Sequence, residues 1–99
     1  MTADKLYQNE DLNLKMLAEA VGLSGHQLSE LINTHFGIGF SRYVRERRIA
    51  EARRLLREDK DASILSISMA TGFRSQSNFY AAFRDIAGMS PGQYRNAPD

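Results

Sequence analysis

Residues 64–88, ILSISMATGFRSQSNFYAAFRDIAG, decide the fold that this sequence predicts. Apolar and small residues recur here at intervals of three and four, which is the spacing of one face of an α-helix. Gly72 interrupts the pattern in the middle and Gly88 ends it, because glycine readily adopts the left-handed conformation that closes a helix. The stretch is therefore predicted to form two helices joined by a tight turn.

A second copy of this pattern lies earlier in the chain. Residues 14–37 read LKMLAEAVGLSGHQLSELINTHFG, and Gly22 and Gly37 precede Gly72 and Gly88 by 50 and 51 positions. The second copy thus has one more residue in its turn. Two copies of one helix pair are the simplest interpretation, and two are too few for a repeat solenoid.

The residues around each turn favour a helix-turn-helix unit. A small residue, Ala18 or Ser68, stands four positions before the turn glycine and lets the helices cross closely. Leu23 or Phe73 follows the glycine and fills the angle between them. The expected apolar stripes of the two second helices are Leu28, Leu31, Ile32 and Phe36, and Phe79, Ala82, Phe83 and Ile86.

The rest of the chain is also predicted to be helical, which gives an all-α fold of about seven helices. Two helix-turn-helix subdomains are joined by a long linker helix. A short helix is expected at about residues 3–8, Ser24 and Gln27 have the spacing of a capping box, and Ser90-Pro91 opens a last turn. Three segments together make one domain: residues 1–39 with the N-terminal helix and first unit, the linker helix at 40–58, and 59–99 with the second unit and C-terminal helix.

Charge is distributed unevenly, although the net charge is only +1. Residues 1–39 carry two lysines and five acids, a balance of −3, and residues 61–99 are neutral with three of each. Residues 40–60 carry seven arginines and one lysine against four acids, a balance of +4. The positive charge is therefore concentrated on the linker helix, where a solvated face is the default interpretation. Arg48 is the exception, and we expect its guanidinium to pair with a carboxylate such as that of Glu19 or Asp85.

Composition excludes several classes of protein. The 99 residues include no cysteine, so disulfides, thiolate metal sites and a cysteine nucleophile are ruled out. No apolar run is long enough to cross a membrane, so no membrane contact is expected from this segment. The two histidines lack the partners of a catalytic triad or a zinc site. We expect no cofactor, no metal and no enzymatic activity, and a cytoplasmic location.

The outward faces of the two second helices carry short, uncharged hydrogen-bonding side chains near the helix N-terminus. Such side chains can read base edges, since glutamine and asparagine make paired bonds to adenine. Helix N-termini also attract phosphate. The positions expected to be exposed are Gly25, His26, Gln27, Ser29, Glu30 and Asn33 in the first copy, and Gln76, Ser77, Asn78, Ala81 and Arg84 in the second. The phosphate candidates are Asn33, Arg74, Ser75 and Arg84.

The linker has a length that suits two adjacent major grooves. Two helices reading one face of DNA lie about one turn apart, ~34 Å. A helix of about 18 residues spans ~27 Å. Units packed on its two ends could reach successive grooves if the DNA bends modestly.

Several stretches of the sequence resemble a known family. Residues 63–84, SILSISMATGFRSQSNFYAAFR, followed by GMSPGQYR at 88–95, resemble the AraC/XylS family signature. YVRERRIAEARRLL at 43–56 is similar to that family's linker helix, and LAEAVGLS at 17–24 with Phe36-Gly is similar to its first helix-turn-helix. The resemblance covers about residues 12–95.

The resemblance implies a bacterial transcription regulator's DNA-binding domain that places two recognition helices in successive major grooves of double-stranded DNA. Its base-contacting positions correspond to His26, Ser29 and Glu30, and to Gln76, Ser77, Asn78 and Ala81. Glu30 and Ala81 stand where relatives often carry arginine. Because a carboxylate is repelled by phosphate, we expect the second unit and the linker to bind DNA more strongly than the first unit.

A second class of function uses the same fold. A helical protein-interaction module could present these polar faces to a partner such as RNA polymerase, without direct base readout. Members of the family also commonly combine this module with a sensor or dimerisation domain. We expect such a domain as a partner here, either fused to this module or separate from it. Enrichment of particular DNA fragments distinguishes the two hypotheses, since an interaction module enriches none.

Overall fold

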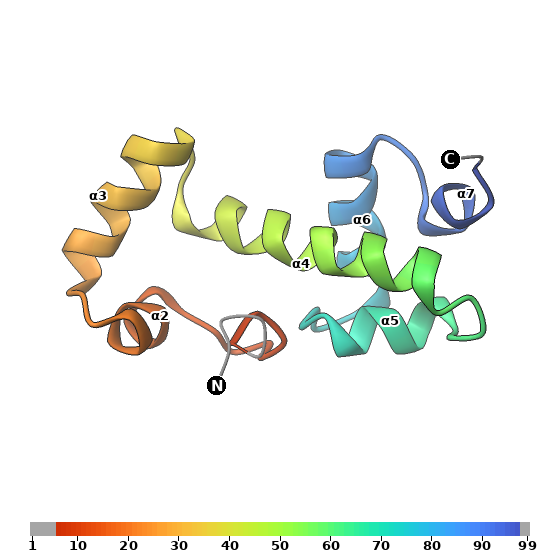
Figure 1. The fold of residues 1–99 in the computed structure, drawn as a ribbon, viewed down its shortest axis with the longest axis horizontal. Helices are drawn as coiled ribbons and strands as arrows, with labels where there is room; N and C mark the ends of the chain where they lie inside the picture. Colours follow the sequence, from red (N-terminus) through yellow and green to blue (C-terminus); the bar gives the residue numbers. More distant parts are fainter. Residues whose placement is uncertain (1–5, 98–99) are drawn as a thin grey trace.

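The computed structural model describes residues 6–97, and every regular element among them is an α-helix. The elements are α2 (Leu14–Val21), α3 (Gly25–Phe36), α4 (Phe40–Glu58), α5 (Ile64–Ala70), α6 (Gln76–Ala87) and α7 (Pro91–Asn96). Figure 1 shows α4 along the long axis, with α2 and α3 at one end and α5, α6 and α7 at the other. The all-α fold of two helix pairs on a linker helix is confirmed. Residues 3–5 of the short helix expected at residues 3–8 lie outside the described residues. Within the described part of the chain, Leu6 and Tyr7 are helical.

Side-chain caps fix where the helices begin. The side chain of Asn13 accepts a hydrogen bond from the Met16 N–H at 2.9 Å and starts α2. Ser24 and Gln27 form the expected capping box, in which each side chain accepts a bond from the other residue's backbone. Ser90 caps α7 in the same way. Each cap contributes about 1 kcal/mol, so local sequence sets these boundaries.

The molecule has two hydrophobic cores, and α4 belongs to both. The first core consists of Tyr7, Leu17, Ala18, Leu28, Ile32 and Val44. The second consists of Ile49, Ala52, Leu56, Ile67, Phe73, Phe79, Ala82 and Phe83. The first half of α4 therefore packs against α3 and shares a core with α2 and α3, and its second half packs against α5, α6 and α7. Burial of these side chains fixes each helix pair to its own end of one continuous helix.

Two expected core residues are not in the core. Leu31 is 44% exposed and Phe36 is 58% exposed, although both lie on the predicted apolar stripe of α3. Ala82, which matches Leu31 in the repeat, is buried because it packs in the core that α6 shares with α4. In the first core Val44 is the buried residue that α4 supplies, with Phe40 and Tyr43 packed partly buried against it, and Leu31 and Phe36 stay largely exposed at its edge.

The segment before α2 connects the two units. The Arg48 side chain on α4 donates from Nε to the carbonyl of Tyr7 and from Nη2 to that of Asn9, both at 2.8 Å. The expected pairing of Arg48 with Glu19 or Asp85 is thus wrong. Partial burial lowers the pKa of Arg48, but a guanidinium stays protonated at neutral pH.

The turn of the second unit packs closely against this segment. Gly72 has φ +94°, and a Cβ placed there would lie 2.3 Å from the Tyr7 carbonyl oxygen and 2.9 Å from Arg48 Nε. Gly22, at the matching position of the first unit, has φ +77° with nothing within 4 Å of such a Cβ. The two glycines therefore share a backbone requirement, and only Gly72 also has a steric one.

Substituting these glycines separates the two requirements. Gly22→Ala should cost about 1–2 kcal/mol of unfolding free energy, because alanine is strained at positive φ. Gly72→Ala should cost a further ~1–3 kcal/mol, because the new methyl group displaces the N-terminal segment. Urea denaturation followed by circular dichroism measures both. Equal losses would show that the contact between Gly72 and Tyr7 is unimportant.

Candidate nucleic-acid interface

The second unit exposes the first turn of α6 to solvent. Ser75 caps α6, since its hydroxyl oxygen accepts a bond from the Asn78 N–H at 3.1 Å. Gln76, Ser77 and Asn78 follow in the first turn and are exposed, and Ala81 is exposed on the next turn. The opposite face of α6 is buried in the second core. The cap and the core thus fix the helix and leave its polar face accessible.

The first unit differs in how its candidate side chains are engaged. His26, Gln27 and Glu30 are exposed, and Ser29 is partly buried. The Gln27 amide oxygen accepts the Ser24 N–H in the capping box, which leaves the amide NH₂ as its outward group. His26 Nε2 lies 3.2 Å from Glu30 Oε1, one turn further along α3. This face is therefore partly self-paired and carries an acid.

The four phosphate candidates are all exposed but not equivalent. Asn33 lies on α3 and Arg84 on the last turn of α6. The Ser75 hydroxyl oxygen already serves as the cap of α6. Arg74 Nη2 lies 2.6 Å from the carboxylate of Asp11, in the segment before α2. Arg74 is thus partnered within the protein.

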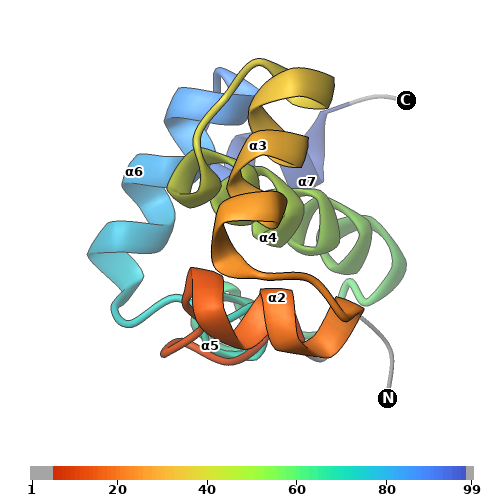
Figure 2. The ribbon, with the colours of Figure 1, turned by 90° about the vertical axis from the view of Figure 1, so that its left-hand side faces the viewer.

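The two candidate recognition helices are arranged alike. In Figure 1, α3 and α6 stand at opposite ends of α4, and both run from the lower to the upper edge of the molecule. Figure 2, viewed along the long axis, shows the same direction for both helices. Their N-terminal ends therefore point the same way, as two equivalent contacts along one duplex require.

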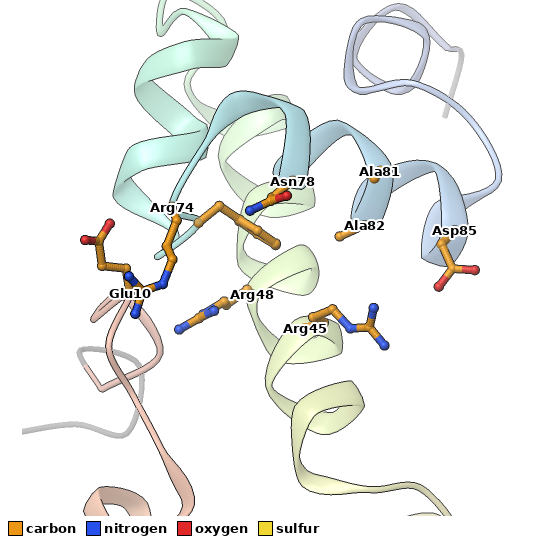
Figure 3. A pocket seen from close by; sticks show the side chains of 9 residues that line it. Glu10, Arg45, Arg48, Arg74, Asn78, Ala81, Ala82 and Asp85 are labelled. Atoms are coloured by element: carbon orange, nitrogen blue, oxygen red, sulfur yellow. The ribbon is translucent and has the colours of Figure 1, made fainter.

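A groove runs beside α6, between that helix, α4 and the N-terminal segment. Its lining includes Arg45 and Arg48 from α4 and Asn78, Ala81 and Asp85 from α6 (Figure 3). Arg74 and Glu10 lie at the N-terminal segment's end of the groove. Candidate base-contacting positions thus lie on the wall of a hollow whose opposite wall is basic.

Arg42 connects α4 to α6 through Asp85, which is one of the residues that line this groove. Its Nη1 lies 2.6 Å from the carboxylate of Asp85, and its Nε lies 2.8 Å from that of Glu46. The sequence predicted one solvated face for the linker arginines and did not indicate this contact. Arg42, Arg45 and Arg48 are spaced three residues apart, so each lies next to the following one on the helix surface. This spacing is the sequence signal that distinguishes them from the other arginines of α4.

The described residues offer little for other kinds of site. Among residues 6–97, no cluster of three His, Cys, Asp or Glu side chains could bind a metal ion. In the same range, no helix is both long and apolar enough to cross a membrane.

Comparison with known proteins identifies the family. The family model described as "helix-turn-helix domain", of the AraC type, matches residues 17–97. The chain belongs to the AraC-type helix-turn-helix family. The DNA-binding role in transcription regulation that the sequence predicted is thereby supported.

Two relatives of different length match most of this chain. The melibiose operon regulatory protein of Escherichia coli K12 is 37% identical over 87 residues, which are 88% of this chain and 28% of that protein. The probable transcription factor PqrA of Proteus vulgaris is 34% identical over 91 residues, which are 92% of this chain and 74% of PqrA. The chain thus spans little more than a quarter of the longer relative.

Two solved structures have the same architecture. An AraC-type transcriptional regulator from Chromobacterium violaceum has a TM-score of 0.81 and 31% identity, with 96% of this chain and 89% of that chain covered. The DNA-binding domain of AdpA, solved with a target DNA, has a TM-score of 0.79 and 25% identity, with 94% and 82% covered.

The Asp11–Arg74 pair generates a prediction about this domain's binding to DNA. Asp11→Asn should leave the unfolding free energy almost unchanged, because exposed ion pairs contribute little. Affinity for a random-sequence duplex should rise roughly three- to tenfold at low salt, because an acid near the groove is lost and Arg74 is released. Fluorescence anisotropy measures the change.

Asp61→Asn is the matched control, since it removes the same charge from an exposed turn between α4 and α5. An equal rise for both variants would mean that overall charge, rather than the Arg74 contact, governs the effect.

Proposed function

We propose that this domain binds double-stranded DNA with α3 and α6 in two successive major grooves, and that α6 reads sequence more strongly than α3. The observation that carries the proposal is the exposed first turn of α6, where Gln76, Ser77 and Asn78 are accessible beside a capped helix N-terminus. Glutamine and asparagine can bond both edge groups of adenine, and serine can donate or accept. Ala81 would contact a thymine methyl group.

The first unit would make a weaker contribution. His26 and Ser29 can bond to base edges, and Gln27 retains its NH₂ group as a donor. Glu30 can accept a bond from the amino group of cytosine but is repelled by phosphate. Because His26 and Glu30 already contact each other, binding to DNA must replace that contact.

Phosphate contacts would come from Asn33, Arg74, Ser75 and Arg84. Asn33 and Arg84 lie on the exposed surfaces of the recognition helices. Arg74 contributes only after its pairing with Asp11 is broken, and Ser75 can donate its hydroxyl hydrogen while its oxygen caps α6. These contacts would position the protein and supply the salt dependence of binding.

The length of α4 sets the geometry of the complex. Its 19 residues span about 28 Å at 1.5 Å per residue. Adjacent major-groove contacts on one face of straight DNA are ~34 Å apart. We therefore expect the bound DNA to bend modestly toward the protein.

The regulator that contains this domain would act without catalysis, in the bacterial cytoplasm where its DNA target lies. A sensor or dimerisation domain, fused or separate, would control it, and RNA polymerase is its expected protein partner. The relatives' regulatory roles and the small share of the melibiose regulator that this chain covers support this view.

Selection of bound sequences from a random duplex library tests the proposal. The expected result is an enriched site with two elements about 10 base pairs apart, of which one is more strongly specified. An unenriched library would contradict the proposal and favour a protein-interaction module.

Substitution of Gln76 tests the direct readout. Gln76→Ala should weaken binding to the selected site by about 1–3 kcal/mol and change binding to random DNA far less, because only base contacts carry sequence information. Gel-shift titration measures both affinities. Gln8→Ala is the matched control, an exposed glutamine outside α6. Equal losses on both duplexes for Gln76→Ala would rule out base reading by Gln76.

A further inference from the structure

The seven arginines of α4 are not equivalent in their contacts. Six have partners: Arg42 pairs with Glu46 and Asp85, Arg48 donates to two carbonyls, Arg54 pairs with Glu51 and Glu58, Arg47 lies over the ring of Tyr7, and Arg53 and Arg57 lie over the ring of Tyr94. Arg45 is exposed and has no hydrogen bond, ion pair or ring contact within residues 6–97.

Arg45 lies on the side of α4 that faces α6 across the groove. It lines the groove beside α6, and it also lines a second hollow formed by the first turns of α4 and Leu12. Figure 3 shows its side chain projecting from α4 on the side where α6 presents Ala81 and Asp85. Arg45 thus lies on α4 between Val44, which is buried in the first core, and Ile49, which is buried in the second.

The surroundings leave the charge of Arg45 uncompensated. The carboxylate of Asp85, on the facing wall, is bound by Arg42, and that of Asp11 is bound by Arg74. Glu10 lies at the groove's end beside Arg48 and Arg74. The guanidinium of Arg45 is therefore exposed to solvent and available to an anionic partner.

We propose that Arg45 binds the DNA backbone bordering the minor groove between the two major grooves that α3 and α6 enter. This inference rests on the proposed function, since two helices in successive major grooves leave one minor groove facing the middle of α4. A guanidinium bonds a phosphate oxygen strongly and without sequence preference. The linker helix would then bind DNA as well as spacing the recognition helices.

Arg45→Gln tests this contact, and Arg54→Gln is the matched control. Both remove one positive charge from α4, but Arg54 is nine residues further on, half a turn around the helix at 100° per residue. Arg45→Gln should weaken binding about tenfold at ~0.1 M salt, equally on the selected site and on random DNA, and should reduce the slope of log affinity against log salt by about 0.9. Arg54→Gln should change neither quantity appreciably.

Further results decide the nature of the contact. Arg45→Lys should retain most of the affinity, because the charge is kept. A lysine variant as weak as the glutamine variant would overturn the proposal, and so would a loss that depends on A·T content between the two elements, because that would indicate reading of minor-groove width. An unchanged salt slope for Arg45→Gln would also overturn it. Failure of the wild-type chain to select any site would instead contradict the proposed function.

Discussion

Val44 is buried in one hydrophobic core and Ile49, five residues further along the same helix, in the other. This sharing of α4 constrains the rest of the molecule. A bend between the two positions would have to open one core or the other, and packed apolar interiors resist such changes. No proline occurs in the linker segment to introduce a kink. The spacing of α3 and α6 is therefore determined by apolar burial on α4, and the polar face of α4 is left for other contacts.

The contacts that surround α4 differ in strength. The exposed pairs of Arg42 with Asp85 and of Arg74 with Asp11 connect distant segments, but exposed ion pairs contribute little to stability. Arg48 contributes more to fixing the N-terminal segment, because its guanidinium is partly buried and satisfies the carbonyls of Tyr7 and Asn9. Gly72 permits that arrangement by leaving room for the Tyr7 carbonyl. The exposed pairs are thus available for exchange with phosphate, while the scaffold beneath them stays in place.

The sequence was sufficient to predict the helices because their ends are locally encoded. Asn13, Ser24 and Ser90 are caps whose bonds reach only three residues ahead. Features that depend on which helices meet were not predictable in the same way. Leu31 fits an apolar stripe, but its exposure follows from the lack of a described helix over it, and the carbonyl partners of Arg48 come from a segment 39 and 41 residues away. For the candidate site, the sequence indicated which residues face outward, whereas only the structure distinguished Arg45 from its partnered neighbours.

Rigid spacing of the two units is the central physical claim, and a distance measurement between them tests it most directly. Because the chain has no cysteine, Thr34→Cys in α3 and Ala70→Cys in α5 provide specific sites for a pair of spin labels. Both positions are exposed and lie outside the proposed DNA contacts. Pulsed electron spin resonance should give one narrow distance distribution that is unchanged when the selected duplex is added. A broad or divided distribution, or a shift of the peak on binding, would contradict the claim that α4 fixes the separation of the two units.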